Sequence, residues 1–310
     1  MELSYRENKT KQQLFVVEGL SKDLLGLPAI IALGLIARTD AIVDSHSAAL
    51  MEKYGSVFQG LGQFGEPYSI RLRPDAKPVS IYTPRRVPFP LRSQVKEELD
   101  RMMSLGVISP VDQPTAWCSG MVAVPKKSGS VRICVDLQRL NESVMREVHP
   151  LPRVDETLAQ LAGARVFSKL DANSGFWQIP LDEDSRLLTT FLTPFGRYCF
   201  NKLPFGICSA SEHFQKEMSR VLEGLEGVVC QVDDVLVHAP DQEAHDARLS
   251  AVLTRLKEKG VTLNKEKCSF SQPRLKFLGH IVDEHGVSAD PEKTTAVQEM
   301  SPPRNTTELK

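Results

Sequence analysis

The chain contains 310 residues, of which 41% are apolar and 25% charged, a composition typical of a globular protein with a sizeable core. Its 38 basic and 39 acidic side chains give a net charge of −1, so composition alone provides no nucleic-acid signal, and any such signal must be local. The six cysteines form no Cys-x-x-Cys pair and no zinc-ligand spacing, which indicates reduced thiols in an intracellular protein. The longest apolar run, 24–37, is interrupted by glycine and proline, is shorter than the roughly 20 residues that span a bilayer, and begins too late for a signal peptide. We therefore expect neither membrane insertion nor secretion.

The first 90 residues predict little regular structure. A strand is expected over 14–17 and a short helix over 28–35, because Pro28 suits a first helical position that needs no amide donor. Residues 45–90 are rich in proline and glycine, which favours a long and mostly extended connector. Basic side chains are concentrated between positions 71 and 92, and a solvated linker is the simplest interpretation of this stretch.

The following segment predicts one amphipathic helix and one hairpin. Apolar residues recur along one face of a helix over 91–105, and Gly106 supplies the stop. Strands are expected over 121–124 and 131–135, separated by a flexible loop that contains Lys126 and Lys127. Such a basic tip can close over an anionic ligand, or it can simply keep an exposed turn soluble.

The remaining elements alternate between strands and helices. They are expected as a helix over 152–162, a strand over 166–170, a hairpin of 189–193 with 197–203, a helix from Ser209 or Ser211 to 222, a hairpin over 228–238, a helix over 242–259 and a strand over 275–282 before a turn at 283–286. This order favours an α+β fold in which an antiparallel sheet is backed by helices, related to the split βαβ plan.

Three carboxylates stand out in this arrangement. Asp171 follows the strand 166–170, and Asp233 with Asp234 lies at the tip of the hairpin 228–238. If that hairpin pairs beside the first strand, the three acids converge at one end of the sheet. Hard divalent cations prefer oxygen ligands, and two such ions can bind the attacking and leaving oxygens of a phosphoryl transfer. The alternative is three unrelated polar turn residues.

A series of short runs follows one order along the chain: 105–108, 117–119, 131–137 with 140–141, 167–171 with 174–179, 203–206, 232–234 and 276–279. With these runs, the chain resembles the reverse transcriptase of gypsy-type (Metaviridae-like) long-terminal-repeat retrotransposons from about residue 80 to residue 297. Each run is weakly informative alone, but their order is highly specific.

The resemblance implies the fingers and palm of a polymerase right hand, with the thumb largely absent, and an RNA-directed DNA polymerase that uses two Mg²⁺ ions, for which Mn²⁺ can substitute. Asp171, Asp233 and Asp234 would be the catalytic metal ligands, assisted by the backbone carbonyl of Ala172. The nucleotide-binding set would be Lys126, Lys127, Arg132, Ala172, Ser174, Gly175 and Phe176, and the primer grip would be Leu278 and Gly279.

Within this set, Lys126 or Lys127 would hold the triphosphate together with Arg132, whose guanidinium favours forked phosphate contacts. Phe176 would lie beneath the sugar and leave no room for a 2′-hydroxyl, although core packing also explains an aromatic ring there. An ordinary hairpin likewise explains Leu278 and Gly279.

Two positions depart from the patterns of relatives. Gln231 replaces an aromatic residue that many reverse transcriptases carry, and Phe205 replaces a glutamine of retroviral enzymes. Neither change removes a metal ligand, so we expect altered fidelity or affinity more than lost chemistry. Residues 24–30 resemble the C-terminal end of a retroviral-type aspartic protease, but no Asp-Ser-Gly or Asp-Thr-Gly triplet occurs, and protease activity is not expected.

The expected domain plan follows from these matches. It comprises a protease remnant over 1–40, a connector over 41–90, fingers with part of the palm over 91–165, the palm over 166–290 and a truncated start of the thumb over 291–310, without RNase H.

The expected partners are an RNA or DNA template with its primer and deoxynucleoside triphosphates. The expected location is the cytoplasm or virus-like particles, and the oligomeric state is left open. The alternative function is a catalytically weak or inactive nucleic-acid-binding remnant. A metal-dependent nuclease is less favoured, because nothing in the chain resembles RNase H.

Overall fold

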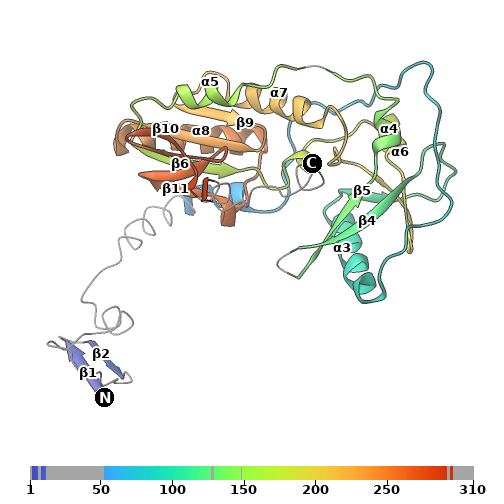
Figure 1. Ribbon diagram of the computed structural model, residues 1–310, viewed down its shortest axis with the longest axis horizontal. Helices are drawn as coiled ribbons and strands as arrows, with labels where there is room; N and C mark the ends of the chain where they lie inside the picture. The colour runs from blue at the N-terminus through green and yellow to red at the C-terminus, as the bar shows by residue number, and fades with distance from the viewer. Residues whose placement is uncertain are drawn as a thin grey trace, which may run out of the picture. The chain divides into compact units, whose positions relative to one another are not determined.

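The computed structural model describes residues 2–5, 8–11, 52–126, 129–147, 149–291 and 294–295, and the chain divides into two units, Met1–Lys53 and Tyr54–Lys310. In the first unit, strands β1 (Glu2–Tyr5) and β2 (Asn8–Lys11) form an antiparallel hairpin. The strand expected over 14–17, the helix expected over 28–35 and the protease-like segment 24–30 lie outside the described residues. The elements that follow belong to the second unit (Figure 1).

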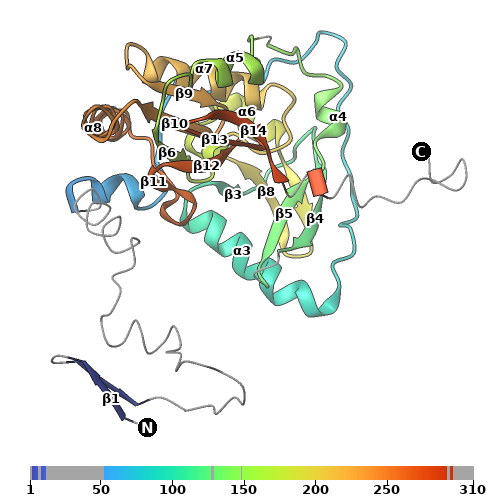
Figure 2. The same cartoon turned by 60° about the vertical axis from the view of Figure 1, so that its left-hand side comes forward.

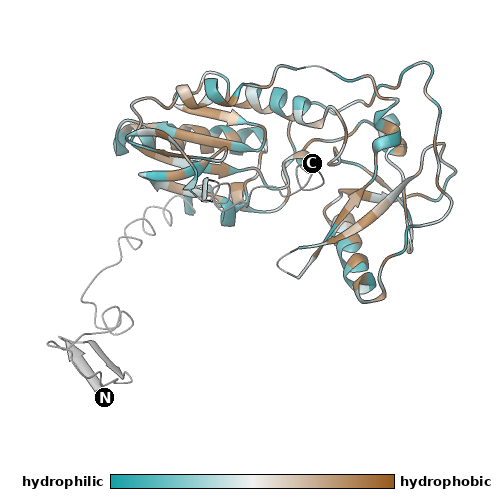
Figure 3. Ribbon diagram, in the orientation of Figure 1, coloured by the Kyte–Doolittle hydropathy of each residue, from teal (hydrophilic) through white to brown (hydrophobic). Residues whose placement is uncertain are grey.

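A four-stranded antiparallel sheet is the core of the C-terminal half of this unit. Its strand order is β11 (Ser269–Gln272), β6 (Val166–Asp171), β10 (Asp234–Ala239) and β9 (Val228–Gln231). The strand expected over 166–170 and the hairpin expected over 228–238 are confirmed, and their strands reach the acidic residues at their ends. Figure 3 shows hydrophobic colour along these strands, as their apolar sequences predict.

Helices α7 (Ala210–Leu222) and α8 (Gln242–Lys259) pack against this sheet. Asp241 caps α8 by accepting a hydrogen bond from the Ala244 amide at 2.8 Å, and Gly260 ends the helix at a φ of 76°, which suits glycine. The helix α8 covers the face of the sheet that carries Ser168, because the Ser168 hydroxyl lies 2.9 Å from His245 Nε2.

The opposite face of the sheet carries a hydrophobic cluster. Phe167 and Leu236 of the sheet belong to it, together with Leu158 of α5 (Val154–Ala159) and Phe277. The helix α5 is shorter than the helix expected over 152–162. Phe167 of this cluster and the candidate carboxylate Asp171 project from the same face of β6.

Phe277 belongs to a separate three-stranded antiparallel sheet, visible in Figure 2, composed of β12 (Arg274–Phe277), β13 (His280–Asp283) and β14 (Gly286–Ala289). The single strand expected over 275–282 is therefore wrong. The chain reverses at Leu278 and Gly279, whose φ values are 49° and 76°. Positive φ at both central residues is the type I′ pattern, which a continuous apolar run conceals because leucine rarely adopts it.

A second sheet has five strands, in the order β3 (Ile108–Pro110), β8 (Gly196–Phe200), β7 (Phe191–Thr193), β4 (Ser119–Pro125) and β5 (Val131–Val135). Helix α3 (Arg92–Ser104) confirms the helix expected over 91–105 and buries Val95, Leu99 and Met102. The strands β7 and β8 lie within the span 166–290, yet they pair with β4 and β3. This sheet is therefore built from two separate stretches of the chain.

Short helices complete the unit: η1 (Gly55–Phe58), η2 (Phe89–Leu91), α4 (Gln138–Asn141), η3 (Gly175–Gln178), α6 (Glu183–Leu188) and η4 (Lys265–Lys267). In the described part of the connector, residues 52–90, the chain is largely irregular as expected, and the basic side chains between positions 71 and 92 are exposed, as a solvated linker predicts. The connector nevertheless packs on the rest of the unit at several points. Tyr68 and Ile70 are buried, and Tyr68 and Ser80 form isolated bridges to Leu181 and Cys118. No helix among the described residues is both long and apolar enough to cross a membrane.

Candidate active site

Two of the three candidate carboxylates lie opposite each other on neighbouring strands. Asp171, the last residue of β6, is the register partner of Asp234, the first residue of β10. Directly opposed residues of an antiparallel pair project from the same face, so both side chains lie on one face at one end of the sheet. Asp233 precedes Asp234 in the turn, and its carbonyl accepts a hydrogen bond from the Ala172 amide at 3.2 Å. The pairing on which the sequence prediction depended, hairpin beside strand, is present.

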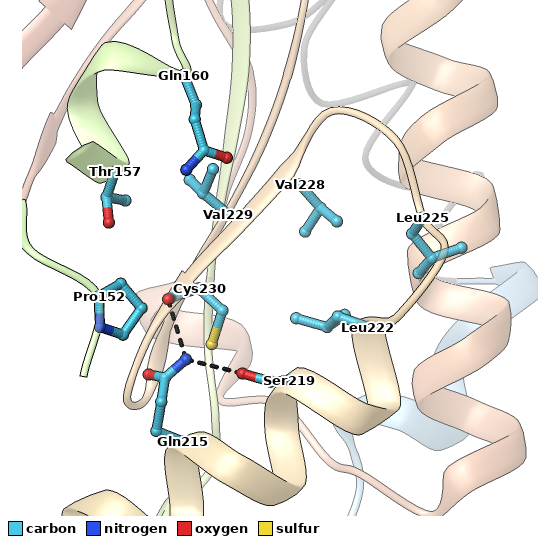
Figure 4. Close-up of a pocket in the computed structure, with 10 residues that line it drawn as sticks. All are labelled: Pro152, Thr157, Gln160, Gln215, Ser219, Leu222, Leu225, Val228, Val229 and Cys230. Carbon is cyan, nitrogen blue, oxygen red and sulfur yellow. Dashed lines mark hydrogen bonds between the residues drawn. The ribbon is translucent and has the colours of Figure 1, made fainter. Parts of the chain in front are cut away.

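The acidic turn, residues 231–234, has an unusual backbone. Val232 has a φ of 56°, which β-branched residues rarely adopt, and Asp233 does not share the positive φ, so the turn has the sign pattern of type II′. Gln215 of α7, only 1% exposed, holds this conformation. Its Oε1 accepts a hydrogen bond from the Val232 amide at 2.6 Å. Its Nε2 donates to the Cys230 carbonyl at 3.3 Å and to Ser219 Oγ at 3.1 Å, the two bonds drawn in Figure 4.

A cavity of about 220 Å³ lies behind the acidic turn, between α5, α7 and β9 (Figure 4). It is lined by Pro152, Thr157, Gln160, Gln215, Ser219, Leu222, Leu225, Val228, Val229 and Cys230. Burial raises the pKa of the Cys230 thiol, and the charges of Asp233 and Asp234 raise it further, so the thiol stays neutral. The Cys230 thiol also donates to the Val232 carbonyl, with an S···O distance of 3.3 Å, which adds a second side-chain contact to the turn.

Two lysines partly neutralise the carboxylates. Lys267 Nζ lies 3.2 and 3.3 Å from the two carboxylate oxygens of Asp171, and Lys169 Nζ lies 2.9 Å from Asp234 Oδ1. Burial raises the pKa of Asp171, the bond to Lys267 lowers it, and the charges of Asp233 and Asp234 raise it again. The repulsion among the three carboxylates is therefore only partly offset by the protein itself.

The donor set fits a hard divalent cation. Within the described ranges, no three His, Cys, Asp or Glu side chains are arranged closely enough to form a metal site in this lysine-paired state. The oxygens of Asp171 and Asp234 nevertheless share one face, and carboxylate oxygens are the ligands that such cations prefer. A cation there would also relieve the repulsion that raises the pKa of Asp171.

The candidate triphosphate ligands lie on the five-stranded sheet, whereas the carboxylates lie on the four-stranded sheet. Lys126 is exposed beside the β4–β5 loop, where its amide donates to the Ser130 carbonyl at 2.7 Å. Arg132 is exposed on β5, opposite Val124. Lys127 lies outside the described residues, so the choice between the two lysines stays open.

Phe176 lies in η3 immediately after the strand of Asp171. Its half-buried ring lies 4.9 Å from the ring of Phe205 and 5.5 Å from that of Phe214, measured between centroids. The loop that leads to Phe176 has two special positions. Ser174 adopts a positive φ of 50°, and Gly175 lies so close to Phe214 that a Cβ there would be only 3.0 Å from Phe214 Cζ. The position of the Phe176 ring is thus fixed by aromatic neighbours, which is compatible with a gate and with a packing role.

Residues 124–282 match the family described as reverse transcriptase (RNA-dependent DNA polymerase). The chain belongs to this family. It is 37% identical over 232 residues to the retrovirus-related Pol polyprotein from transposon opus of Drosophila melanogaster, a match that covers 72% of this chain and 23% of that protein. It is 32% identical over 218 residues to the transposon Tf2-3 polyprotein of Schizosaccharomyces pombe, covering 70% of this chain and 16% of the relative. The chain therefore spans less than a quarter of either polyprotein.

The fold has counterparts of known structure. The foamy viral protease-reverse transcriptase in complex with RNA/DNA hybrid matches with a TM-score of 0.75 at 21% identity, over 88% of this chain and 37% of that one. A form of that enzyme in complex with double-stranded DNA matches with a TM-score of 0.77 at 22% identity, over 88% and 48% of the two chains. These matches show that the chain has the α+β fold of a polymerase with fingers and palm.

Sequence reasoning missed three polar residues around the carboxylates of the reverse transcriptase domain. Gln215 lies within the apolar stripe of α7, where a polar residue gives no signal of its own. Lys169 had a signal, because strand alternation places it on the same face as Asp171, two residues away. Lys267 lies in η4, which the sequence pattern does not predict, and only the tertiary fold brings it to Asp171.

Proposed function

We propose that this reverse transcriptase domain extends a primer on an RNA or DNA template by adding deoxynucleotides, with Asp171, Asp233 and Asp234 binding two Mg²⁺ ions. The observation that carries this proposal is the register of β6 and β10, which sets Asp171 opposite Asp234 with Asp233 in the adjoining turn. Mn²⁺ has the same preference for oxygen ligands and would substitute. The solved relatives complexed with RNA/DNA hybrid and double-stranded DNA support a nucleic-acid partner.

The chemistry divides among the residues of the chain as follows. The primer 3′-hydroxyl attacks the α-phosphate of the nucleotide and pyrophosphate leaves; bound divalent cations would stabilise the charge on the attacking and leaving oxygens. The three carboxylates and the Ala172 carbonyl would hold those cations. Arg132, with Lys126 or Lys127, would bind the triphosphate, since exposed cations on a hairpin can close on an anion.

The remaining candidate residues would select and position the substrates. The Phe176 ring, fixed by Phe205 and Phe214, would exclude a 2′-hydroxyl, with Ser174 and Gly175 shaping the loop beneath the nucleotide. The type I′ turn at Leu278 and Gly279 would hold the primer end. It projects from the three-stranded sheet, which packs through Phe277 against the hydrophobic cluster on the four-stranded sheet.

The proposed domain plan keeps the fingers over 91–165 and the palm over 166–290, with one exception. Because β7 and β8 pair with β4 and β3, residues 189–203 are better assigned to the fingers. The proposed protease remnant over 1–40 and the proposed start of the thumb over 291–310 lie mainly outside the described residues.

A primer-extension assay on poly(rA)/oligo(dT) with Mg²⁺ tests the proposal. The unmodified chain should incorporate deoxythymidylate, and a variant with Asp233→Asn and Asp234→Asn should lose incorporation by at least roughly 1,000-fold, because the metal ligands lose their charge. Asp75→Asn, which neutralises an exposed carboxylate of the connector, is the control and should be unaffected. Equal incorporation by all three proteins would falsify the catalytic assignment. Binding of the primer–template without incorporation by the unmodified chain would instead favour a nucleic-acid-binding remnant.

A further inference from the structure

Lys169 lies on the four-stranded sheet beside the carboxylates, and the proposed function gives it no role. It lies two residues before Asp171 on β6, so both side chains project from the same face. Its register partner on β10 is Leu236, two residues after Asp234, which makes Lys169 and Asp234 diagonal neighbours on that face. Their Nζ and Oδ1 atoms are 2.9 Å apart.

The surroundings of Lys169 hold its ammonium group near the carboxylates. Along β6 it stands between Phe167, in the hydrophobic cluster, and Asp171. The side chains of Lys169 and Asp234 are each 26% exposed, whereas the side chain of Lys267, the partner of Asp171, is 62% exposed. Lys169 is therefore much less exposed to solvent than Lys267, and it is the more firmly held of the two cations.

We propose that Lys169 is a built-in counter-ion of the carboxylate site, which stabilises Asp234 while the site holds no divalent cation and competes with that cation for the same carboxylate. This inference rests on the proposed binding of metal by Asp171, Asp233 and Asp234. Lys169 is a positioning residue, since it acts through Asp234 and contacts no substrate.

Electrostatics gives the direction of the effect. A fixed ammonium group roughly 5 Å from a divalent cation repels it, and in a partly solvated and salt-screened site this repulsion is worth about a five-fold change in affinity. Removing the charge should therefore tighten divalent-cation binding. When no cation is bound, it should also lower the stability of the folded chain, because the Asp234 carboxylate then has lost its paired cation. A lysine with only a packing role would produce neither effect.

The experiment measures Mn²⁺ binding directly, by electron paramagnetic resonance of free Mn²⁺ in the absence of nucleotide and nucleic acid. Lys169→Met removes the charge, and Lys169→Arg keeps it. Lys96→Met removes a lysine that pairs with Asp100 on α3 at 2.6 Å, and it serves as the matched control. We expect Lys169→Met to lower the dissociation constant roughly five-fold, and the other two variants to match the unmodified chain.

Thermal melting provides a second readout. In EDTA, Lys169→Met should melt below the unmodified chain, and saturating Mn²⁺ should raise its melting temperature by more than it raises that of the unmodified chain, because tighter binding stabilises the folded state more. If Lys169→Met fails to fold, Lys169→Gln removes the same charge and retains a polar head.

The outcomes separate this inference from the proposed function. If Mn²⁺ binds the unmodified chain and binding is lost in the Asp233→Asn, Asp234→Asn variant, the metal site stands. Unchanged or weaker binding by Lys169→Met then overturns the role of Lys169 alone. If the Asp233→Asn, Asp234→Asn variant binds Mn²⁺ as well as the unmodified chain does, the metal site itself is refuted, and the role of Lys169 is refuted with it.

Discussion

Replacing Gln215 by leucine should detach the acidic turn from α7. The change keeps a side chain of similar size but removes the acceptor of the Val232 amide and the donor to the Cys230 carbonyl and Ser219 Oγ. Val232 holds a φ of 56°, an unfavourable conformation that persists only where its surroundings impose it. Without Gln215, the turn is therefore expected to relax and to carry Asp233 with it.

The magnitude follows from the bonds that are lost. An unsatisfied buried amide costs about 1–3 kcal/mol, and Val232 is half-buried, so water recovers part of this. Relief of the positive φ offsets some of the remainder, and we expect a net loss of about 2 kcal/mol in the free energy of unfolding. Displacement of a catalytic group by about 1 Å can cost roughly 100-fold in rate. A loss of about 2 kcal/mol leaves most chains folded, so the fall in rate would report the displaced carboxylate and not unfolding.

Urea unfolding and steady-state primer extension measure the two quantities. Gln215→Leu should lower kcat roughly 100-fold with a change in KM for the nucleotide of less than about three-fold, because the carboxylates move while the proposed triphosphate ligands on β4–β5 do not. Gln160→Leu is the matched control, since Gln160 lines the same cavity but is exposed, and its side chain makes one hydrogen bond within the described part of the chain, to the Glu156 carbonyl at 3.4 Å. Normal kcat in Gln215→Leu, or an equal loss in Gln160→Leu, would refute the proposed hold on the turn.

Other substitutions test the remaining parts of the site. Gly175→Ala should lower the free energy of unfolding by about 1–3 kcal/mol in urea, because its Cβ would lie 3.0 Å from Phe214 Cζ, and adding Phe214→Leu should restore part of the loss. Phe176→Val should raise ribonucleotide incorporation at least roughly ten-fold relative to deoxynucleotides; unchanged discrimination would leave Phe176 as a packing residue only. Arg132→Gln should raise the KM for the nucleotide roughly ten-fold with little change in kcat, and an unchanged KM would remove Arg132 from the triphosphate site. Burial, with a contribution from Arg248, lowers the pKa of His238 from 6.5 to about 4. As the pH falls, the unfolded chain therefore takes up this proton first. The free energy of unfolding present above about pH 6.5 should be lost progressively between about pH 6.5 and 4. Urea titrations of His238→Gln over this range should show a smaller decrease in the free energy of unfolding than those of the unmodified chain.

The sequence was sufficient for the elements that carry the carboxylates, because their physical signals are local. Short β-branched runs bounded by acids and turns predict β6, β9 and β10. The register of β6 with β10 needed the structure, because both strands are buried on both faces and alternation does not fix it. Helix α3 and helix α8 were equally predictable, since each has an apolar stripe and a glycine at its end.

The features that the sequence did not predict depend on contacts between distant parts of the chain. The turn at Leu278 places leucine in a conformation that its own propensity disfavours, so tertiary packing must impose it. Gln215 looks like an interruption of an apolar stripe until the acidic turn is placed beside it. Residues 52–90 look like a linker by composition, yet Tyr68 is buried and bridges to Leu181, more than 100 positions along the chain.

The charges of the candidate site suggest an order of binding. With Lys169 and Lys267 paired to Asp234 and Asp171, three carboxylates and two ammonium groups leave one net negative charge. A triphosphate approaching this state meets repulsion rather than attraction. Two divalent cations would reverse the sign of the site and make it attractive to the same anion. Nucleotide affinity should therefore depend steeply on the concentration of divalent cation, and a variant without the Lys169 charge should reach full nucleotide affinity at a lower concentration of that cation.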